Sequence, residues 1–365
     1  MKFTGRAAVG IAITVLLLWW VLGGVSFDEV WTEVREANLW LLGLGVAMAT
    51  ATFFLRALRW KVLLQPIHPG SSLRSRFAAV NIGFMANNLL PARVGEFARA
   101  YALARLESVS VSGSFGSLVV ERFLDGLTLL FFVLMVMASP GFPSEASMGD
   151  LSPGVLFRGV GVVLVVLLGA MLALVLFPGV VVGLAEKVTS RLPGSVGRAA
   201  VDALRAFLGG LALFRTPGPL ATAVLWSLLI WAWQAAAFWA GLQAFGIQVG
   251  FDGALFVNGI IAFAVAVPAA PGFFGTFQAG AMLGLGVYGV AEAPAVAFSI
   301  GFHLGGFVPV TVIGLYYAWR LGLSLREVGE SESRVERAVE MNHGKGGDSP
   351  GGMAADPAPT VSNEP

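Results

Sequence analysis

Six charged residues lie within two otherwise hydrophobic stretches of the chain. They are Arg93, Glu96, Arg99, Glu121, Arg122 and Asp125. An ionisable side chain at the centre of a bilayer costs about 2.5–3.5 kcal/mol, so each of them needs a partner or a purpose. Three cations and three carboxylates can neutralise one another, and the i, i+4 spacing of Glu121 and Asp125 places those two on one helix face. We therefore expect a single buried polar cluster.

Two chemical roles fit this cluster. The first is a salt-bridge network that fixes a broken helix against the hydrophobic span at 112–138. The second is a polar cavity for a zwitterionic or anionic head group, in which Arg93, Arg99 and Arg122 hold a phosphate through planar, bidentate donors. Asn88 would lie beside that phosphate, and the carboxylates would balance the arginines or meet an amine. The two roles are compatible, and the sequence leaves both open.

Other kinds of site find little support in the sequence. The chain has no cysteine, which excludes disulfides, thiol nucleophiles and zinc–thiolate sites. Its three histidines, His68, His303 and His343, are too scattered to indicate a metal cluster. No nucleophile–base pair accompanies the carboxylates, so we expect no enzyme activity, no cofactor and no metal. His303 lies in the apolar run FSIGFHLGGF, where we expect a hydrogen-bonded packing residue, with a proton relay as the alternative.

The elements that position these residues must be membrane helices. Of the 365 residues, 56% are hydrophobic and 12% are charged. That is about half the charged fraction of soluble domains, so much of the exterior must face lipid. The net charge of +1 gives no indication of a nucleic-acid partner. We predict an all-α fold, a polytopic membrane helix bundle. The expected full spans are 6–25, 38–58, 112–138, 156–177, 219–244 and 294–319.

Two further hydrophobic segments, near 77–105 and 253–290, are broken by proline and glycine. LLPARVGEF in the first and AVPAAPGFF in the second share the pattern P-A-x-x-G-x-F. The expected helix-breaking residues are Pro91, Gly95, Pro268, Pro271 and Gly272. The spans that precede the two segments run in opposite directions, which predicts two inverted repeats with broken, re-entrant helices around a midplane site. A chance match in a glycine-rich chain is the alternative.

Basic residues set the expected orientation. Lys2 and Arg6 place the N-terminus inside, as part of a retained anchor, because the apolar run that follows is too long for a signal peptide. The loops at 26–37, 139–152 and 245–252 are acidic on balance or lack lysine and arginine, so we expect them outside. Both termini are then cytoplasmic.

Three other segments complete this topology. Arg56, Arg59 and Lys61 are interpreted as interfacial anchors at the inner end of a span. The connection at 178–215 has apolar and basic residues at helical spacing and is expected on the inner membrane surface. Residues 1–328 are expected to form the transmembrane domain, and the Glu-rich and then Gly/Pro-rich residues 329–365 a disordered cytoplasmic tail.

The runs RALRWKVLL, NIGFMANNLLPARVGEFARAYAL and SLVVERFLDGLTLL together resemble the lysylphosphatidylglycerol synthase transmembrane-region family, also called the flippase-like domain family. VPAAPGFFGTFQAGAM looks like its second half, and the resemblance covers about residues 5–325. It implies a protein of a prokaryotic cytoplasmic membrane. The motif positions are Asn88, Pro91, Arg93, Gly95, Glu96, Arg99, Glu121, Arg122, Asp125, Pro268, Pro271 and Gly272.

In the best-known members of that family, this domain is linked to the movement of an aminoacylated phospholipid between leaflets. Their soluble aminoacyl-transferase domain has no counterpart in these residues, so synthase activity is not expected. We expect instead a flippase-like transporter that moves a phospholipid or lipid-linked head group. The alternatives are an accessory membrane subunit of a lipid-linked glycosyltransferase or other lipid-modifying enzyme, and a structural scaffold. The expected partner is a membrane lipid, phospholipid or polyprenyl-linked; a homo-oligomer and a separate lipid-modifying enzyme stay open.

Overall fold

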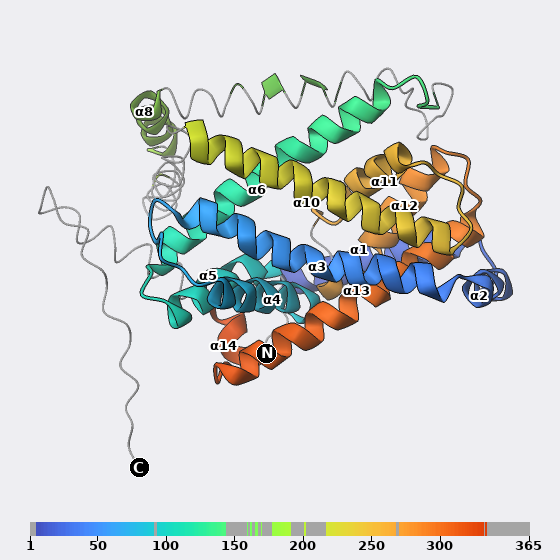
Figure 1. Cartoon of the computed structure of the whole chain (residues 1–365), viewed down its shortest axis with the longest axis horizontal. Coiled ribbons are helices and arrows are strands. Elements are labelled where there is room, and N and C mark those ends of the chain that lie inside the picture. Colours follow the sequence, from blue (N-terminus) through green and yellow to red (C-terminus); the bar gives the residue numbers. More distant parts are fainter. Residues whose placement is uncertain are drawn as a thin grey trace, which may run out of the picture.

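The computed structural model describes most of the chain as a set of packed helices (Figure 1). The residues it describes are 5–90, 93–143, 177–190, 217–267 and 270–331, with isolated positions between 159 and 201 and at 333. Every regular element within these ranges is a helix, which confirms the all-α membrane bundle. The predicted span at 156–177 lies almost wholly outside the described residues, as do most of the connection that follows it and the tail beyond 333.

Two groups of helices share one order of elements: a long helix, a broken pair of short helices and a second long helix. The first group is α3 (Leu39–Leu64), α4 (Leu73–Leu89), α5 (Gly95–Leu106) and α6 (Val111–Met137). The second is α10 (Pro217–Ala244), α11 (Phe251–Ala264), the 3-10 turn η3 (Pro271–Phe273), α12 (Thr276–Gly286) and α13 (Glu292–Arg320). Both broken segments therefore occur where the proline and glycine pattern predicts them.

Among the described helices, α3, α10 and α13 are long and apolar enough to cross a membrane. A fourth crossing results if α1 (Gly5–Leu22) and α2 (Phe27–Glu36) count as one span, although they are bent by 81°. The helix α6 has 27 residues, enough to span a bilayer, but it carries three charged side chains. Two shorter helices, α8 (Pro178–Thr189) and α14 (Leu325–Gly329), complete the described set.

Proline determines where the short helices end and begin again. Leu90 follows α4 with extended angles, φ −111° and ψ 144°, and Ala270 precedes Pro271 with φ −62° and ψ 161°. A proline excludes the helical region for the residue before it, because its ring clashes with that residue's N–H and Cβ. Gly272 then turns the chain at φ 77°, a conformation that glycine adopts without strain.

Glycine lets α4 and α5 pack closely as a hairpin. A Cβ on Gly83 would lie 2.7 Å from the carbonyl oxygen of Gly95, too close for any other residue type. The side-chain oxygen of Asn87 accepts the Gly95 N–H at 2.8 Å, which satisfies one of the free donors at the start of α5. Two other predicted helix-breaking residues, Pro91 and Pro268, lie outside the described residues.

The first helices of the two groups, α3 and α10, are antiparallel neighbours. The N–H of Asn38, just before α3, donates to the carbonyl of Ala244 at the end of α10 at 2.7 Å. Near the opposite ends, Arg59 donates to the hydroxyl of Ser227 at 2.9 Å. The connections before α3 and after α10 therefore lie at the same end of the bundle, as the predicted alternation requires. An inverted repeat needs this arrangement, and the repeat itself stays a prediction.

The two broken pairs lie toward opposite ends of the bundle, and the long helices α3, α10 and α13 extend along it (Figure 1). The helix α13 packs against α4 in the first pair and against α12 in the second, while α10 packs against α11. The turn η3 also contacts α4, so the break of the second pair reaches the first. The polar residues described next are gathered in this central region.

Candidate functional site

Glu121 is the centre of a buried ion-pair network. Its carboxylate is fully buried and accepts two hydrogen bonds from Arg99, at 2.7 and 3.0 Å, in the bidentate geometry that strengthens such pairs. Arg122 donates to the same carboxylate at 2.6 Å. The guanidinium of Arg99 also lies over the ring of Trp60, 3.9 Å from its centre. These contacts tie α5 to α6 and both of them to α3.

Asp125, one turn further along α6, binds a second pair of arginines. Arg59 donates to it at 2.6 Å and Arg56 at 3.1 Å, both from α3. The indole N–H of Trp231 in α10 donates to the same carboxylate at 3.0 Å. Arg122 lies 3.5 Å away. The network therefore joins α3, α5, α6 and α10 across what would be the interior of the membrane.

The interpretation of Arg56 and Arg59 as interfacial anchors is wrong. Both side chains are buried, with 7% and 0% exposure, and both pair with the carboxylates of α6. Lys61 is exposed in the last turn of α3, as an anchor would be. An unpaired charge in an apolar helix is costly, and this cost predicted partners for the charged residues of α6. The same argument holds for Arg56 and Arg59 in the apolar helix α3, and it predicts that they too are paired.

Arg93 lies apart from this network, so its predicted membership is wrong. Its guanidinium donates to the carbonyl oxygens of Val265 and Ala266 at 3.0 and 2.7 Å, at the C-terminal end of α11. It also lies over the ring of Phe273, 5.5 Å from the centre. A cation at a helix C-terminus is favoured by the free carbonyls and the helix dipole. Arg93 thus connects the first break to the second.

Glu96 makes no ion pair with the network, although it lies near enough to Arg93 and Arg122 for its charge to act on both. The side chain is half-buried in the first turn of α5, and it makes no ion pair with any residue that the structure describes. Of the six charged residues in the predicted cluster, the structure brings together four, and it adds two arginines from α3. They are Arg99, Glu121, Arg122 and Asp125, with Arg56 and Arg59.

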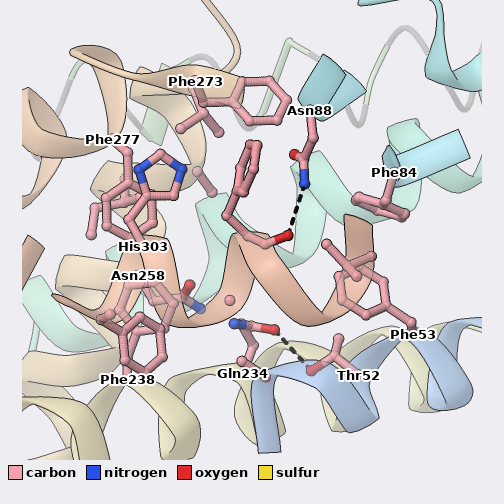
Figure 2. Close-up of a pocket in the computed structure, with 18 of the residues that line it drawn as sticks. Thr52, Phe53, Phe84, Asn88, Gln234, Phe238, Asn258, Phe273, Phe277 and His303 are labelled. Carbon is pink, nitrogen blue, oxygen red and sulfur yellow. Dashed lines mark hydrogen bonds between the residues drawn. The ribbon is translucent and has the colours of Figure 1, made fainter. Parts of the chain in front are cut away.

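A cavity of about 230 Å³ lies beside the network, between α3, α4, α10, α11 and α13 (Figure 2). Phenylalanine side chains form much of its wall. The polar residues that line it are Thr52, Arg56, Asn88, Gln234, Asn258 and His303. Phe273 of η3 and Val265 at the end of α11 also line it, so the second helix break faces the cavity. Arg56 and Trp231 belong to both the cavity and the network.

Several of the polar groups in the cavity are held in place by hydrogen bonds. Thr52 donates to the side-chain oxygen of Gln234 at 2.8 Å (Figure 2). Asn88 donates to the hydroxyl of Thr311 at 2.8 Å and to the carbonyl oxygen of Phe307 at 3.4 Å. His303 shares a hydrogen bond with Gln278 at 3.1 Å and stacks on Phe277. His303 is therefore a hydrogen-bonded packing residue, one of the two roles expected for it.

Of the residues predicted to bind a head group, Asn88 is the one that lines the cavity. Sequence reasoning missed the amides Gln234 and Asn258, which lie in the hydrophobic helices α10 and α11. Such a residue is costly in lipid unless it faces a partner or a cavity, and that cost is the signal that could have found them. Among the described residues, no group of three or more histidine, aspartate or glutamate side chains has a geometry that could hold a metal ion.

Residues 7–314 match the sequence profile of the family described as the lysylphosphatidylglycerol synthase TM region. This match covers the first group of helices, the second group as far as residue 314, the ion-pair network and the lining of the cavity. The chain belongs to this family. Together with its span-length helices, membership makes it a multi-pass membrane protein, and it confirms the resemblance inferred from the motifs.

Relatives of known sequence include two membrane proteins and one glycosyltransferase. A UPF0104 membrane protein of Methanothermobacter thermautotrophicus is 22% identical over 339 residues, which cover 90% of this chain and 98% of that protein. A UPF0104 membrane protein of Methanocaldococcus jannaschii is 25% identical over 134 residues, covering 36% and 40%. Glycosyltransferase AglD of Haloferax volcanii is 27% identical over 145 residues, covering 38% and 23%. The matches thus span less than half of the latter two relatives.

Proposed function

We propose that this protein is a lipid flippase-like transporter that moves the head group of a phospholipid or other lipid between leaflets. The observation that carries the proposal is the cavity, which lies inside the bundle and combines aromatic walls with amide groups and Arg56. A polar head group that crosses a bilayer must exchange water for polar groups within protein, and such a cavity offers them. Family membership supports a role with membrane lipids.

The helix breaks support the same proposal. Interrupted helices at membrane depth are tolerated where they are buried in protein or line a cavity, and transporters use them at substrate sites. Here Arg93, from the first break, binds the end of α11, and Phe273, from the second, lines the cavity. Movement of either broken pair would therefore change the shape of the cavity, as alternating access requires.

The network has a positioning role in this proposal. It fixes α3, α5, α6 and α10 relative to one another and holds Arg56 at the edge of the cavity through Asp125. Its carboxylates are paired with arginines, which leaves neither of them free to act as a general base. We therefore assign transport to the chain, and no chemical reaction. We place the transporter in the cytoplasmic membrane of a prokaryote, with both termini cytoplasmic.

A flipping assay with a cavity-filling variant tests the proposal. Gly306 lines the cavity, and a Cβ at this position meets nothing within 4 Å, so Gly306→Phe should enter the open space. Gly43 on α3 is exposed, is equally uncrowded and does not line the cavity, so Gly43→Phe is the matched control. The purified full chain is reconstituted in vesicles with phosphatidylglycerol that carries a dithionite-sensitive fluorophore on its acyl chain. Dithionite added outside the vesicles quenches only the fluorophores in the outer leaflet.

Wild type and Gly43→Phe should expose the inner-leaflet lipid to dithionite faster than protein-free vesicles do. Gly306→Phe should return the rate to that of protein-free vesicles while it keeps the wild-type elution volume and thermal midpoint. Equal rates for the two glycine variants would show that the cavity is not the path. A wild-type rate no higher than the protein-free rate, with several lipid classes tried, would reject transport.

A second candidate is an accessory subunit of a lipid-linked glycosyltransferase. The similarity to glycosyltransferase AglD supports this candidate, because part of this chain matches part of a protein described as a glycosyltransferase. In this case, deletion of the gene should change the amount of a glycosylated lipid product, and the chain should co-purify with a separate enzyme. Unchanged lipid products together with flipping by the purified chain alone would reject this candidate. A pure scaffold would show neither flipping nor a change in products.

A further inference from the structure

Arg56 has unused hydrogen-bonding capacity. Its guanidinium carries five N–H donors, and only Nη1 is bonded to a described residue, Asp125 at 3.1 Å. Nε and Nη2 make no hydrogen bond to any described residue, although the side chain is only 7% exposed and lines the cavity. Aromatic rings flank it: the centres of Phe84 and Trp231 lie 5.6 and 5.3 Å from Cζ. Because Arg56 lines the cavity, an anionic acceptor there can form charge-assisted hydrogen bonds with these free donors.

The charges of the network add to this preference. Four guanidinium groups face two carboxylates, which leaves a formal excess of two positive charges. Arg122 is 38% exposed and can be solvated. Arg59 and Arg99 are enclosed against the carboxylates of α6. Arg56 is the member that lines the cavity, so an anion bound there balances part of the excess.

Two amides provide neutral polar groups in the same cavity. Thr52 and Arg56 are four residues apart on α3 and so share one face, and Thr52 holds the side-chain oxygen of Gln234. The Nε2 of Gln234 makes no hydrogen bond to a described residue. Asn258 is only 4% exposed, and its amide makes no hydrogen bond within the described part of the chain. Figure 2 shows both amides at the cavity.

The described lining of the cavity offers no carboxylate to a cation. None of these residues is aspartate or glutamate, and Asp125, the carboxylate nearest to Arg56 in the network, is already bound by Arg59 and Trp231. An ammonium group on a bound lipid would therefore lose its hydration without gaining a carboxylate, and it would share the cavity with Arg56. Transfer of a charge out of water without a partner is strongly unfavourable.

We propose that the cavity recognises a head group made of one phosphate anion and an uncharged, hydroxyl-bearing substituent. The phosphate binds the free donors of Arg56, the hydroxyls bind Gln234 and Asn258, and a head group with an amine is disfavoured. The volume of about 230 Å³ has room for such a head group. The inference specifies the substrate class of the proposed transporter and rests on that function for its physiological role.

The test measures binding separately from transport, by calorimetric titration of the full chain in detergent. The probes are dioctanoyl phosphatidylglycerol, dioctanoyl lysylphosphatidylglycerol and dioctanoyl phosphatidylethanolamine, with glycerol 1-phosphate and inorganic phosphate as lipid-free anions. Phosphatidylglycerol should bind about tenfold or more tightly than either amine-bearing lipid, a difference of about 1.4 kcal/mol or more. Equal or tighter binding of an amine-bearing lipid overturns the inference. Preference for a lipid-free anion over phosphatidylglycerol would assign the site to soluble phosphates, and it would overturn the lipid assignment.

Two variants identify the groups responsible. Arg56→Gln should weaken phosphatidylglycerol and glycerol 1-phosphate alike, by about tenfold or more, because it removes the charge-assisted donors. Asn258→Leu, which breaks no hydrogen bond to a described residue, should weaken phosphatidylglycerol and leave inorganic phosphate unchanged. Their matched controls are Arg326→Gln, on an exposed arginine of α14, and Gln248→Leu, on an exposed glutamine between α10 and α11. Wild-type affinity in both cavity variants overturns the inference.

The two proposals fail in different ways. Selective, Arg56-dependent binding without flipping in vesicles would reject the transporter and keep the site. Flipping at equal rates for phosphatidylglycerol and lysylphosphatidylglycerol, with equal affinities, would keep the transporter and reject the selectivity. If Arg56→Gln does not fold, Asn258→Leu and the ranking of the lipids by the wild type still decide the outcome.

Discussion

Arg93 and Phe273, one from each helix break, contact each other, with the guanidinium carbon 5.5 Å from the centre of the ring. Both have a positive φ, 55° and 61°, and among the described residues they are the two that do so without being glycine. A left-handed conformation costs such a residue roughly 1–2 kcal/mol. The contact therefore joins two strained positions, each held by its surroundings, and the strain lies where the two broken pairs meet.

At position 93, the glycine variant should be more stable than the alanine variant, the reverse of the usual order of stability. Both variants lose the bonds to the Val265 and Ala266 carbonyls, but glycine also relieves the positive φ. Arg93→Ala should therefore be less stable than Arg93→Gly by about 1 kcal/mol, measured as unfolding of the purified chain in detergent. Glycine as the less stable variant would contradict a strained backbone at this position.

A double-mutant cycle isolates the contact itself. Arg93→Gln, Phe273→Leu and the double variant should give a coupling energy of about 0.5–2 kcal/mol, because a partly desolvated cation–π pair is lost in each single variant. A matched cycle combines Arg93→Gln with Phe54→Leu, on an exposed ring of α3, and should give additive changes. Additivity in both cycles would mean that the two breaks are not coupled through this pair.

Glu121 should matter far more to stability than Glu96. Glu121→Gln leaves Arg99 without its buried counter-charge and Arg122 with Asp125 alone, and removal of one member of a buried pair costs about 3–5 kcal/mol. Glu96→Gln makes the same chemical change at a half-buried carboxylate without an ion pair to a described residue, so it should change stability by less than about 0.5 kcal/mol. Equal losses for the two variants would contradict the network as it is described.

The sequence alone predicted the elements well, for two physical reasons. Hydrophobic runs long enough to span a bilayer have few alternatives to a helix, because every backbone group must be satisfied within the segment. Proline and glycine act locally, so Leu90 and Ala270 could be expected to leave the helical region whatever surrounds them. Gly95 and Gly272 likewise occur at the breaks.

The partners of charged side chains were harder to predict. Spacing along α6 indicated that Glu121 and Asp125 share a face, but nothing in a single sequence says which distant helix packs against that face. Arg59 and Asp125 are 66 residues apart, and Arg93 reaches Ala266 across 173. Arg93 was assigned to the nearest carboxylates in sequence, whereas in the structure the free carbonyls at the end of α11 take its donors. Tertiary packing decided both cases.

Glu107 gives the stability of the chain a pH dependence in the acid range. It lies in the connection between α5 and α6, where it accepts the N–H of Ser72 at 3.0 Å and bonds His68 at 3.0 Å. Burial raises the pKa of Glu107, but the bonds from Ser72, Ser75 and His68 outweigh it and lower the pKa from 4.5 to about 2. Because the pKa is lower in the folded state, the ionised Glu107 carboxylate stabilises the fold. This stabilisation is complete above pH 4.5 and is lost as the pH falls through about 2.

Glu107→Gln should therefore be less stable than the wild type at neutral pH, and the gap should narrow as the pH falls below about 4.5. The measurement compares thermal midpoints of the two proteins between pH 3 and 7 in one detergent. His68→Asn in both backgrounds removes the imidazole that bonds Glu107. A gap that is constant over the whole range would show that the Glu107 carboxylate contributes no charge-dependent stability.

The orientation can be tested cleanly because the chain has no cysteine. Gly70, between α3 and α4, is exposed and uncrowded, and Gln248, between α10 and α11, is exposed. The distribution of basic residues places Gly70 inside and Gln248 outside. A membrane-impermeant maleimide should label Gln248→Cys in intact cells, and it should label Gly70→Cys only after the membrane is permeabilised.

Ser147→Cys, in the predicted outer loop at 139–152 and outside the described residues, should behave like Gln248→Cys. The cysteine-free chain gives the background, and denatured samples show that each cysteine can react. Labelling of Ser147→Cys only from the cytoplasm would contradict the predicted orientation.

The bond between Asn38 and Ala244 adds an internal check on the same topology. It places the connection at 26–37 at the same end of the bundle as Gln248. Glu36, at the exposed end of α2, is a suitable position in that connection, so Glu36→Cys should be labelled from the same side as Gln248→Cys. Labelling of these two variants from opposite sides would contradict the antiparallel pairing of α3 and α10. Labelling of both variants only from the cytoplasm would keep that pairing and invert the orientation. The pairing fixes which connections lie at the same end of the bundle, whereas the basic residues predict which end faces the cytoplasm.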